Sequence, residues 1–284
     1  MTFPQPACAG TIRRLFAGVA LSLGVAAPSG QQPVPVRPAE EPPPLLEDAF
    51  NKMIDNQGHW AFTQVQTLTG FTAALGRETV FRFDPSKPYA GQLAPLKVEG
   101  HDPTDRQRRE FREIGERMAK RRAEDKRDTT RHTGDELKIN LNSRIVTPDL
   151  LHATVVNEDA TSVTYAVPLR EKGAAGTSAF EGFEVTARIS KQRREFEHAT
   201  FRQRAPMRVD VVAKVSDAVI DCEFAPADPA FPAVIMVEHE QATVRILFVK
   251  RVLRVEVRRS TFERVTPYDQ RFGVRVGPLR TLDF

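Results

Sequence analysis

Hydrophobic and polar positions alternate with a two-residue period through most of the second half of the chain. From residue 136 onward, runs such as 163–169 and 183–189 carry an apolar side chain at every second position. The same alternation recurs at 209–215 and 253–257. A two-residue period is typical of antiparallel strands with one covered face and one solvated face. The pattern therefore predicts a large antiparallel sheet.

Two later segments, 232–237 and 244–249, are apolar on nearly both faces. Strands of this kind lie centrally in a sheet or beneath covering helices. Turn residues are expected at 171–177, 225–232 and 240–242. The polar triplet Glu238-His239-Glu240 precedes the last of these turns. We interpret the triplet as solvent-facing residues at a strand end.

A first helix is predicted over 45–57, where apolar residues recur at helical spacing after a run of prolines. Gly58 supplies the left-handed residue that ends it. Its single apolar stripe indicates that the helix lies on a hydrophobic surface. Strands are expected at 59–68 and 77–84. Trp60, at the start of the first, is placed equally well at a cavity rim or between helix and sheet.

A second helix is predicted over 103–127, with Asp102 as its N-cap, Pro103 as its first residue and Asp105 in a capping box. Between residues 105 and 127 it carries ten basic and six acidic residues and only a thin apolar stripe. Two interpretations stay open. The helix is either a solvated element that rests on the sheet by one narrow edge, or a basic arm that faces anionic headgroups or an acidic partner.

The first 44 residues differ from the rest of the chain in their pattern of basic, apolar and proline residues. Arg13 and Arg14 precede an apolar run at 15–27 that small residues follow, as in a secretory signal peptide. A buried core helix is the alternative interpretation of this run. A transmembrane helix is not expected, because the run is too short to span a bilayer. We expect a signal peptide at 1–30, a proline-rich linker at 31–44 and a single domain at 45–284. The mature protein is then periplasmic or secreted.

Charge, cysteine content and aromatic composition limit the classes of partner that we expect. The formal net charge of +4 is mild, which argues against a nucleic-acid partner. Removal of Cys8 with the signal leaves Cys222 alone, so no intrachain disulfide is expected, and a small buried hydrophobe is favoured over a reactive thiol. Eighteen phenylalanines accompany three tyrosines and one tryptophan. Apolar faces poor in hydrogen-bonding rings suit acyl chains better than sugars.

No motif indicates a reaction. None of the six histidines has a second histidine or cysteine at ligand spacing, and the HExxH pattern that begins at His239 fails at its last position. The glycine-rich segment 173–178 lacks the lysine of a phosphate-binding loop and the spacing of a nucleophile elbow. We therefore expect no catalytic residue, no metal and no cofactor.

Several short stretches resemble the lipoprotein-carrier fold of the bacterial periplasm, the LolA/LolB-like family. They are AFTQ at 61–64, the phenylalanine-bearing strand at 77–84, DPAFP at 228–232 and FERV at 262–265. The resemblance implies a mostly β fold with α-helices, in which one large curved antiparallel sheet (a half-barrel) is covered by the N-terminal helix and by the inserted charged helix 103–127. Acyl chains would be held between the sheet and the helices. The segment 85–134 is longer than the family requires, and no cysteine follows the signal to anchor a lipid.

The alternation and the resemblance together select candidate site residues. The hydrophobic lining is expected from Phe62, Phe81, Phe83, Val185, Ile189, Val211 and Val215. A lid or headgroup contact is expected from Phe50, Met53, Ile54, Arg108, Arg109 and Arg112.

Two functions follow from these expectations, and a hydrolase with a scattered site is a more distant third. The first is an exported carrier or binding protein for a lipid or an acylated protein. The second is a non-enzymatic interaction or sensor module of a cell-envelope complex that uses the same fold, with an envelope protein as partner. Neither function calls for nucleic acid or for a transmembrane segment in the mature chain.

Overall fold

The computed structural model describes residues 22–27, 41–56, 58–70, 77–128, 133–141, 144–173, 176–208, 213–246 and 249–268. Strands form most of this part of the chain. They are accompanied by the α-helices α2 (Pro44–Asn56) and α3 (Asp105–Asp128) and by the short 3-10 helices η1 (Tyr89–Gly91) and η3 (Leu150–His152). The described residues are therefore mostly β, as the alternation predicts.

The strands pair into one antiparallel sheet. They are β1 (Ser22–Ala27), β2 (Trp60–Thr69), β3 (Glu78–Phe83), β4 (Leu93–Val98), β5 (Thr133–Leu141), β6 (Arg144–Pro148), β7 (Thr154–Glu158), β8 (Ser162–Gly173), β9 (Gly176–Ser190), β10 (Phe196–Gln203), β11 (Met207–Arg208), β12 (Ala213–Ala225), β13 (Val234–Ile246) and β14 (Val249–Arg264). Their order is β1-β5-β6-β8-β9-β10-β12-β13-β14-β2-β3-β4, with β7 beside β8 and β11 beside β12.

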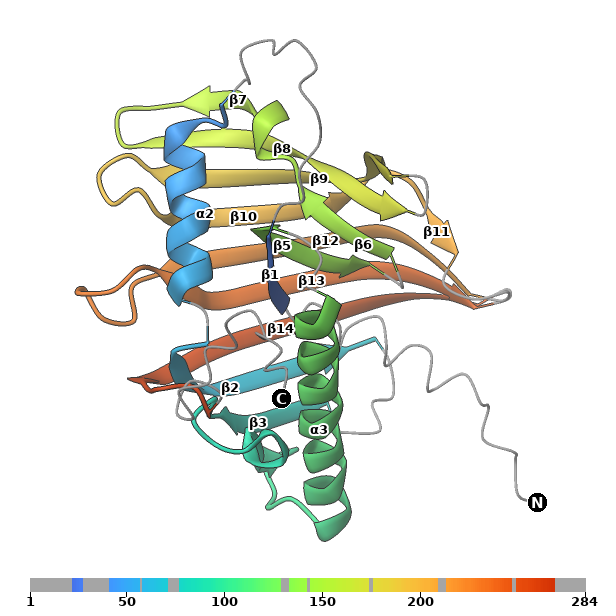
Figure 1. Ribbon diagram of the computed structural model, residues 1–284. Helices are drawn as coiled ribbons and strands as arrows, with labels where there is room; N and C mark the ends of the chain where they lie inside the picture. Colours follow the sequence, from blue (N-terminus) through green and yellow to red (C-terminus); the bar gives the residue numbers. More distant parts are fainter. Residues whose placement is uncertain are drawn as a thin grey trace, which may run out of the picture.

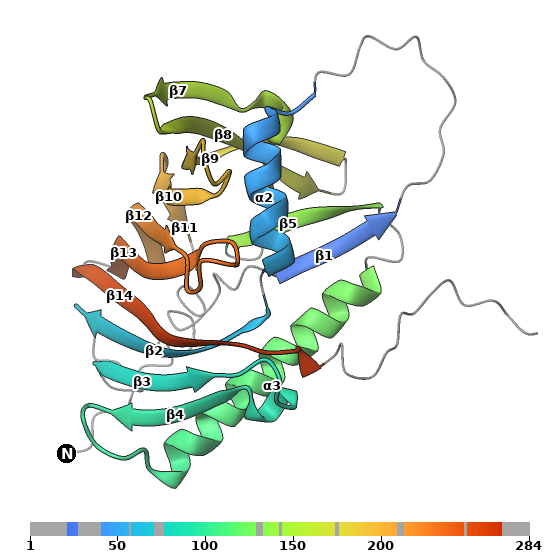
Figure 2. The ribbon, with the colours of Figure 1, turned by 90° about the vertical axis from the view of Figure 1, so that its left-hand side faces the viewer.

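The sheet is curved and open, and both α-helices lie on one of its faces (Figures 1 and 2). We call this the inner face and the opposite one the outer face. Helix α2 crosses the strands β8 to β12, whereas α3 lies over the edge formed by β2, β3 and β4 (Figure 1). The predicted architecture, a curved antiparallel sheet covered by an N-terminal helix and an inserted charged helix, is confirmed.

Helix α2 forms because its apolar side chains fall on one stripe. Leu46, Ala49 and Phe50 are buried against the inner face of β8, β9 and β10. The helix ends one residue before the predicted position, and Gly58 has the left-handed backbone (φ +85°) expected of a helix stop. The apolar spacing was thus sufficient to predict both the helix and the face that it buries.

The end of α2 is tied to three other segments through the buried side chain of Asn56. Its Nδ2 donates to the carbonyl of Pro232 (2.9 Å), ahead of β13. Its Oδ1 accepts from Trp60 Nε1 (3.0 Å) at the start of β2 and from Arg264 Nη1 (2.8 Å) at the end of β14. Trp60 is itself buried, which decides between its two predicted positions in favour of burial.

Three further features differ from the prediction. β13 runs unbroken through the turn expected at 240–242, because its alternation continues and backbone pairing to β12 and β14 is kept on both sides. β4 was not predicted, since Pro95 interrupts its short apolar pattern. Helix α3 begins later than expected. Thr104 and Gln107 form its capping box, while Asp102 pairs with Lys97 (2.6 Å).

The predicted signal peptide and linker lie outside the described residues except for β1 and residues 41–44. β1 pairs with β5, on the same side of the sheet as the helices (Figure 2). The signal peptide stays a prediction.

Candidate functional site

The inner face falls into two parts with different packing. Under α2 it is a closed core. Val185 and Ile189, two of the predicted lining residues, are buried there against Leu46, Ala49 and Phe50. The ring of Phe50 makes an edge contact with Phe196, with ring centroids 5.0 Å apart. The chain's own side chains therefore occupy the space between α2 and the sheet.

The other predicted residues near α2 follow the same pattern. Met53 packs against this core, and Ile54 is half-buried. Val215 is buried in a separate apolar cluster with Ala242, Val244 and Leu253, further along the inner face. Val211 lies outside the described residues.

Under α3 the inner face is aromatic and less completely covered. Phe62, Phe81 and Phe83 share this face and remain half-buried. The rings of Phe62 and Phe83 lie 5.2 Å apart between centroids, and Phe81 lies 5.7 Å from Phe111 of α3. The structure therefore brings these three predicted residues together as one patch, beneath a different helix from the one expected.

Helix α3 rests on this patch through a narrow stripe. Phe111 and Gly115 are buried, and Ile114 is half-buried. Gly115 lies against the 3-10 helix η1, so closely that a Cβ atom placed on it would be 2.7 Å from the carbonyl oxygen of Tyr89. Because glycine lacks that atom, the helix can approach the η1 backbone.

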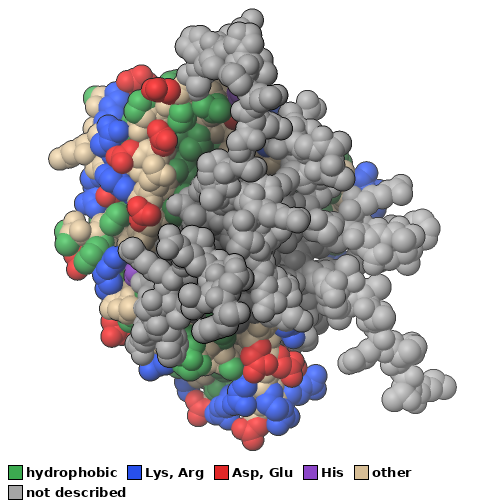
Figure 3. Space-filling model, viewed as in Figure 1, with side chains coloured by type: hydrophobic (Ala, Val, Ile, Leu, Met, Phe, Trp, Pro, Cys, Tyr) green, Lys and Arg blue, Asp and Glu red, His purple; other side chains and the backbone are tan. Residues whose placement is uncertain are grey.

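The opposite side of α3 is charged and solvated. Arg108 pairs with Asp105 (3.0 Å), and Arg109 and Arg112 are exposed. In the space-filling view, basic side chains interspersed with acidic ones gather at the lower end of the molecule, where the N-terminal half of α3 lies (Figure 3). The predicted headgroup residues are therefore exposed to solvent, with Arg109 nearly opposite Phe111 on the helix and Arg108 and Arg112 beside its buried stripe.

Two buried glutamates lie on the inner face between the two parts. Glu238 and Glu240 are each 6% exposed, on β13. Arg259 donates to Glu238 (Nη2–Oε2 2.9 Å) and to Gln64 (Nε–Oε1 3.1 Å). Burial among apolar neighbours, and then the charge of Glu238 and a hydrogen bond with it, raise the pKa of Glu240 to about 9, against the opposing effect of Arg259.

The prediction that Glu238 and Glu240 face solvent is therefore wrong, and only His239 between them is exposed. The pattern did contain the signal. Ala242 and Val244 are buried on the same face, and counting back by twos from them reaches both glutamates.

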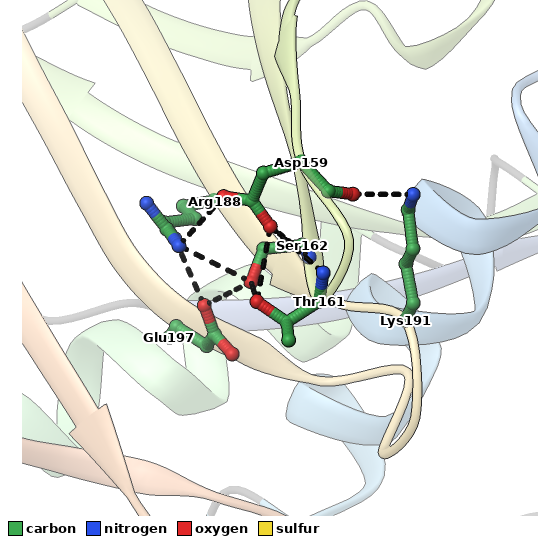
Figure 4. A network of polar contacts seen from close by, with 6 residues as sticks. All are labelled: Asp159, Thr161, Ser162, Arg188, Lys191 and Glu197. Atoms are coloured by element: carbon green, nitrogen blue, oxygen red, sulfur yellow. Dashed lines mark hydrogen bonds and ion pairs between the residues drawn. The ribbon is translucent and has the colours of Figure 1, made fainter.

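The lone cysteine and the polar network at the turn between β7 and β8 both have structural roles. Cys222 is buried, and burial raises the pKa of its thiol, so the small-hydrophobe interpretation is supported. At the turn between β7 and β8, Asp159 accepts hydrogen bonds from the backbone N–H groups of Thr161 and Ser162 and pairs with Arg188 (3.0 Å). This network fastens one hairpin to the next on the outer face. Its members are Asp159, Thr161, Ser162, Arg188, Lys191 and Glu197 (Figure 4).

Within the described residues, no cluster of three or more histidine, cysteine, aspartate or glutamate side chains has a metal-binding arrangement. In the same part of the chain, neither α2 nor α3 combines the length and apolar character that a membrane-crossing helix needs.

Comparison of the chain with protein-family models, with curated proteins and with solved structures finds no match. The likeness to lipoprotein carriers therefore stays a prediction from short sequence stretches.

Proposed function

We propose that the protein is an exported, non-enzymatic carrier that holds an acyl chain of a lipid or lipoprotein between α3 and the inner face of the sheet. The observation that carries this proposal is the half-buried aromatic patch of Phe62, Phe81 and Phe83 at the end of the sheet that α3 covers. An apolar surface of this kind loses contact with water when a hydrophobic ligand lies between it and the helix.

The contrast between the two helices favours a ligand position under α3 over one under α2. Displacing α2 would open a closed core, whereas the buried stripe of α3 in its described part consists of Phe111, Ile114 and Gly115, and Gly115 lies against η1. Each methylene group of an acyl chain contributes about 0.8 kcal/mol when it is buried, so an apolar patch binds such a chain without a polar contact. The exposed arginines of α3 would then lie beside the headgroup.

Replacing both Phe81 and Phe83 by aspartate is expected to abolish retention of bound lipid, because charged groups would lie where the chain must be desolvated. The measurement is native mass spectrometry of protein purified from a periplasmic extract without detergent. Wild type should carry a mass excess that matches a lipid or an acylated peptide, and the double variant should not.

Val80→Asp provides the matched control, since it adds a charge to the same strand on the outer face. A second variant, Phe83→Trp, keeps the patch apolar and fills space that a chain would occupy, so it is expected to lower binding of a fluorescent fatty acid. Retention of lipid by the folded aspartate variant would contradict the proposal.

Replacing Gly115 by valine is expected to displace α3, because the added Cβ atom would collide with the backbone of η1. Overpacking of this kind costs about 1–3 kcal/mol. If α3 gates the site, a bound fluorescent fatty acid should dissociate faster from the variant, and hydrogen exchange of α3 should accelerate. Gly91→Val is the control, since a Cβ there meets only Lys87 at an ordinary 3.7 Å. Faster exchange of α3 with unchanged dissociation would show that α3 is no gate.

The closed core under α2 favours a second candidate, an interaction or sensor module of an envelope complex. In that case the exposed arginines of α3 form the docking surface. Wild-type protein that carries no extra mass in the same spectra, and that binds no fluorescent fatty acid, would favour this module over the carrier.

A further inference from the structure

Four basic residues lie side by side in one row across four strands at one end of the sheet. In the pairing register, Arg208 of β11 is opposite Lys214 of β12, Lys214 is opposite Arg245 of β13, and Arg245 is opposite Lys250 of β14. We call this the basic row. The sequence separates its members, and only the register of the sheet aligns them.

Among the described residues, no carboxylate forms an ion pair with Lys214, Arg245 or Lys250, and all three side chains are exposed. Directly opposed residues of antiparallel strands have Cβ atoms about 4.5–5.5 Å apart, and like charges at that spacing repel. Asp217, three residues after Lys214, accepts a hydrogen bond from Ser216 (3.0 Å). An anion from solution would relieve the repulsion that the protein leaves in place.

Three of these residues, Lys214, Arg245 and Lys250, line a small hollow on the outer face. Its volume is about 120 Å³, and its walls are Pro206, Lys214, Ser216, Thr243, Arg245 and Lys250. A hollow of this size holds a single compact anion. Guanidinium and ammonium groups that converge on one point are the usual partners of a phosphate group.

Exposed valines flank the basic row on β14. Val252, 38% exposed, lies beside Lys250 on the outer face, while Val249, 54% exposed, points to the inner face at the very start of the strand. A sheet end that carries exposed apolar side chains beside cationic ones suits the boundary between headgroups and acyl chains in a bilayer. The neighbourhood therefore favours a phosphate that belongs to a lipid over one that is free in solution.

We propose that the basic row binds the phosphate group of an anionic lipid headgroup and so holds this end of the sheet against a bilayer surface. The row lies on the face opposite the aromatic patch, so the proposal does not depend on carriage of an acyl chain.

The test is co-sedimentation of the full chain with vesicles of phosphatidylcholine alone or mixed with equal parts of phosphatidylglycerol. Wild type should bind the mixed vesicles and be released by salt, because exposed charges are screened. Changing Lys214, Arg245 and Lys250 together to glutamine should lower binding at least about tenfold.

The triple variant Arg202→Gln, Arg254→Gln and Arg258→Gln removes the same charge from exposed positions elsewhere on the outer face. This control should bind within about twofold of wild type, since its arginines lie outside the row. An equal loss in both triple variants would show a general charge effect and overturn the proposal. So would a failure of wild type to bind the mixed vesicles.

A second measurement uses inorganic phosphate and thermal unfolding. Phosphate should raise the unfolding temperature of wild type above that in chloride of equal ionic strength, and leave the row variant unchanged. Without phosphate, the row variant should be at least as stable as wild type, because the repulsion is gone. Stabilisation by phosphate without vesicle binding would assign the hollow to free phosphate and overturn the lipid assignment.

Discussion

Alanine in place of Asn56 is expected to lower the free energy of unfolding by about 3 kcal/mol, because buried polar groups that lose their partners cost about 1–3 kcal/mol each. The side-chain amide of Asn56 forms hydrogen bonds with the carbonyl of Pro232, the indole of Trp60 and the guanidinium of Arg264. Alanine leaves the buried indole of Trp60 and the partly buried carbonyl of Pro232 without this partner. Arg264 is still held over the Phe231 ring, 3.9 Å from its centroid, so its loss is smaller.

Urea unfolding followed by the fluorescence of Trp60 measures this effect directly, since the chain has a single tryptophan. Asn51→Ala is the control, because Asn51 is exposed on the same helix. We expect that variant to lie within about 0.5 kcal/mol of wild type. Equal stability of both alanine variants would show that the Asn56 hydrogen bonds do not hold the four segments together.

Wild type is expected to become less stable as the pH rises, because Glu240 is buried. Replacing Glu240 by glutamine is expected to abolish this pH dependence. The pKa of Glu240 is raised from 4.5 to about 9 in the folded protein, so its carboxyl group stays protonated where the unfolded chain ionises. Unfolding then releases a proton. The contribution of Glu240 to the free energy of unfolding is therefore fully present below about pH 4.5 and is lost progressively as the pH rises toward 9. The slope approaches about 1.4 kcal/mol per pH unit for one proton.

Unfolding of wild type and Glu240→Gln at pH 5, pH 7 and pH 9 provides the test. The two proteins should be similarly stable at the lowest pH, because glutamine keeps the neutral, hydrogen-bonding character of the protonated acid. At the highest pH the variant should be the more stable by a margin on the order of several kcal/mol. Glu223→Gln, an exposed position on β12, should follow wild type. Parallel curves for Glu240→Gln and wild type would show that Glu240 ionises as readily when folded as when unfolded.

Local patterns predicted those elements whose shape depends on neighbouring residues. The helical spacing of Leu46, Ala49 and Phe50 predicted α2, and strict alternation predicted the hairpin of β8 and β9. The long strand β13 was divided in the prediction, because a polar triplet resembles a turn when only its own residues are considered. What keeps it extended is pairing with β12 and β14, which depends on residues far away in the chain.

The candidate sites show the same division. Alternation alone placed Phe81 and Phe83 on one face, and the structure agrees. It could not place α3 over them, since the apolar stripe of that helix fits several surfaces. The basic row was beyond prediction, because Lys214, Arg245 and Lys250 become neighbours only through the register of three long strands.

The position of β2 between β14 and β3 also constrains how the protein is made. β2 is among the first segments to leave the ribosome, yet its partner β14 is among the last. A contact between such distant segments closes a very long loop, and folds rich in such contacts form slowly. During synthesis the hairpin of β2 and β3 therefore has an open edge and uncovered phenylalanines until almost the whole chain has emerged. Such an edge pairs readily with other chains, so we expect the incomplete chain to be prone to aggregation until β14 has emerged.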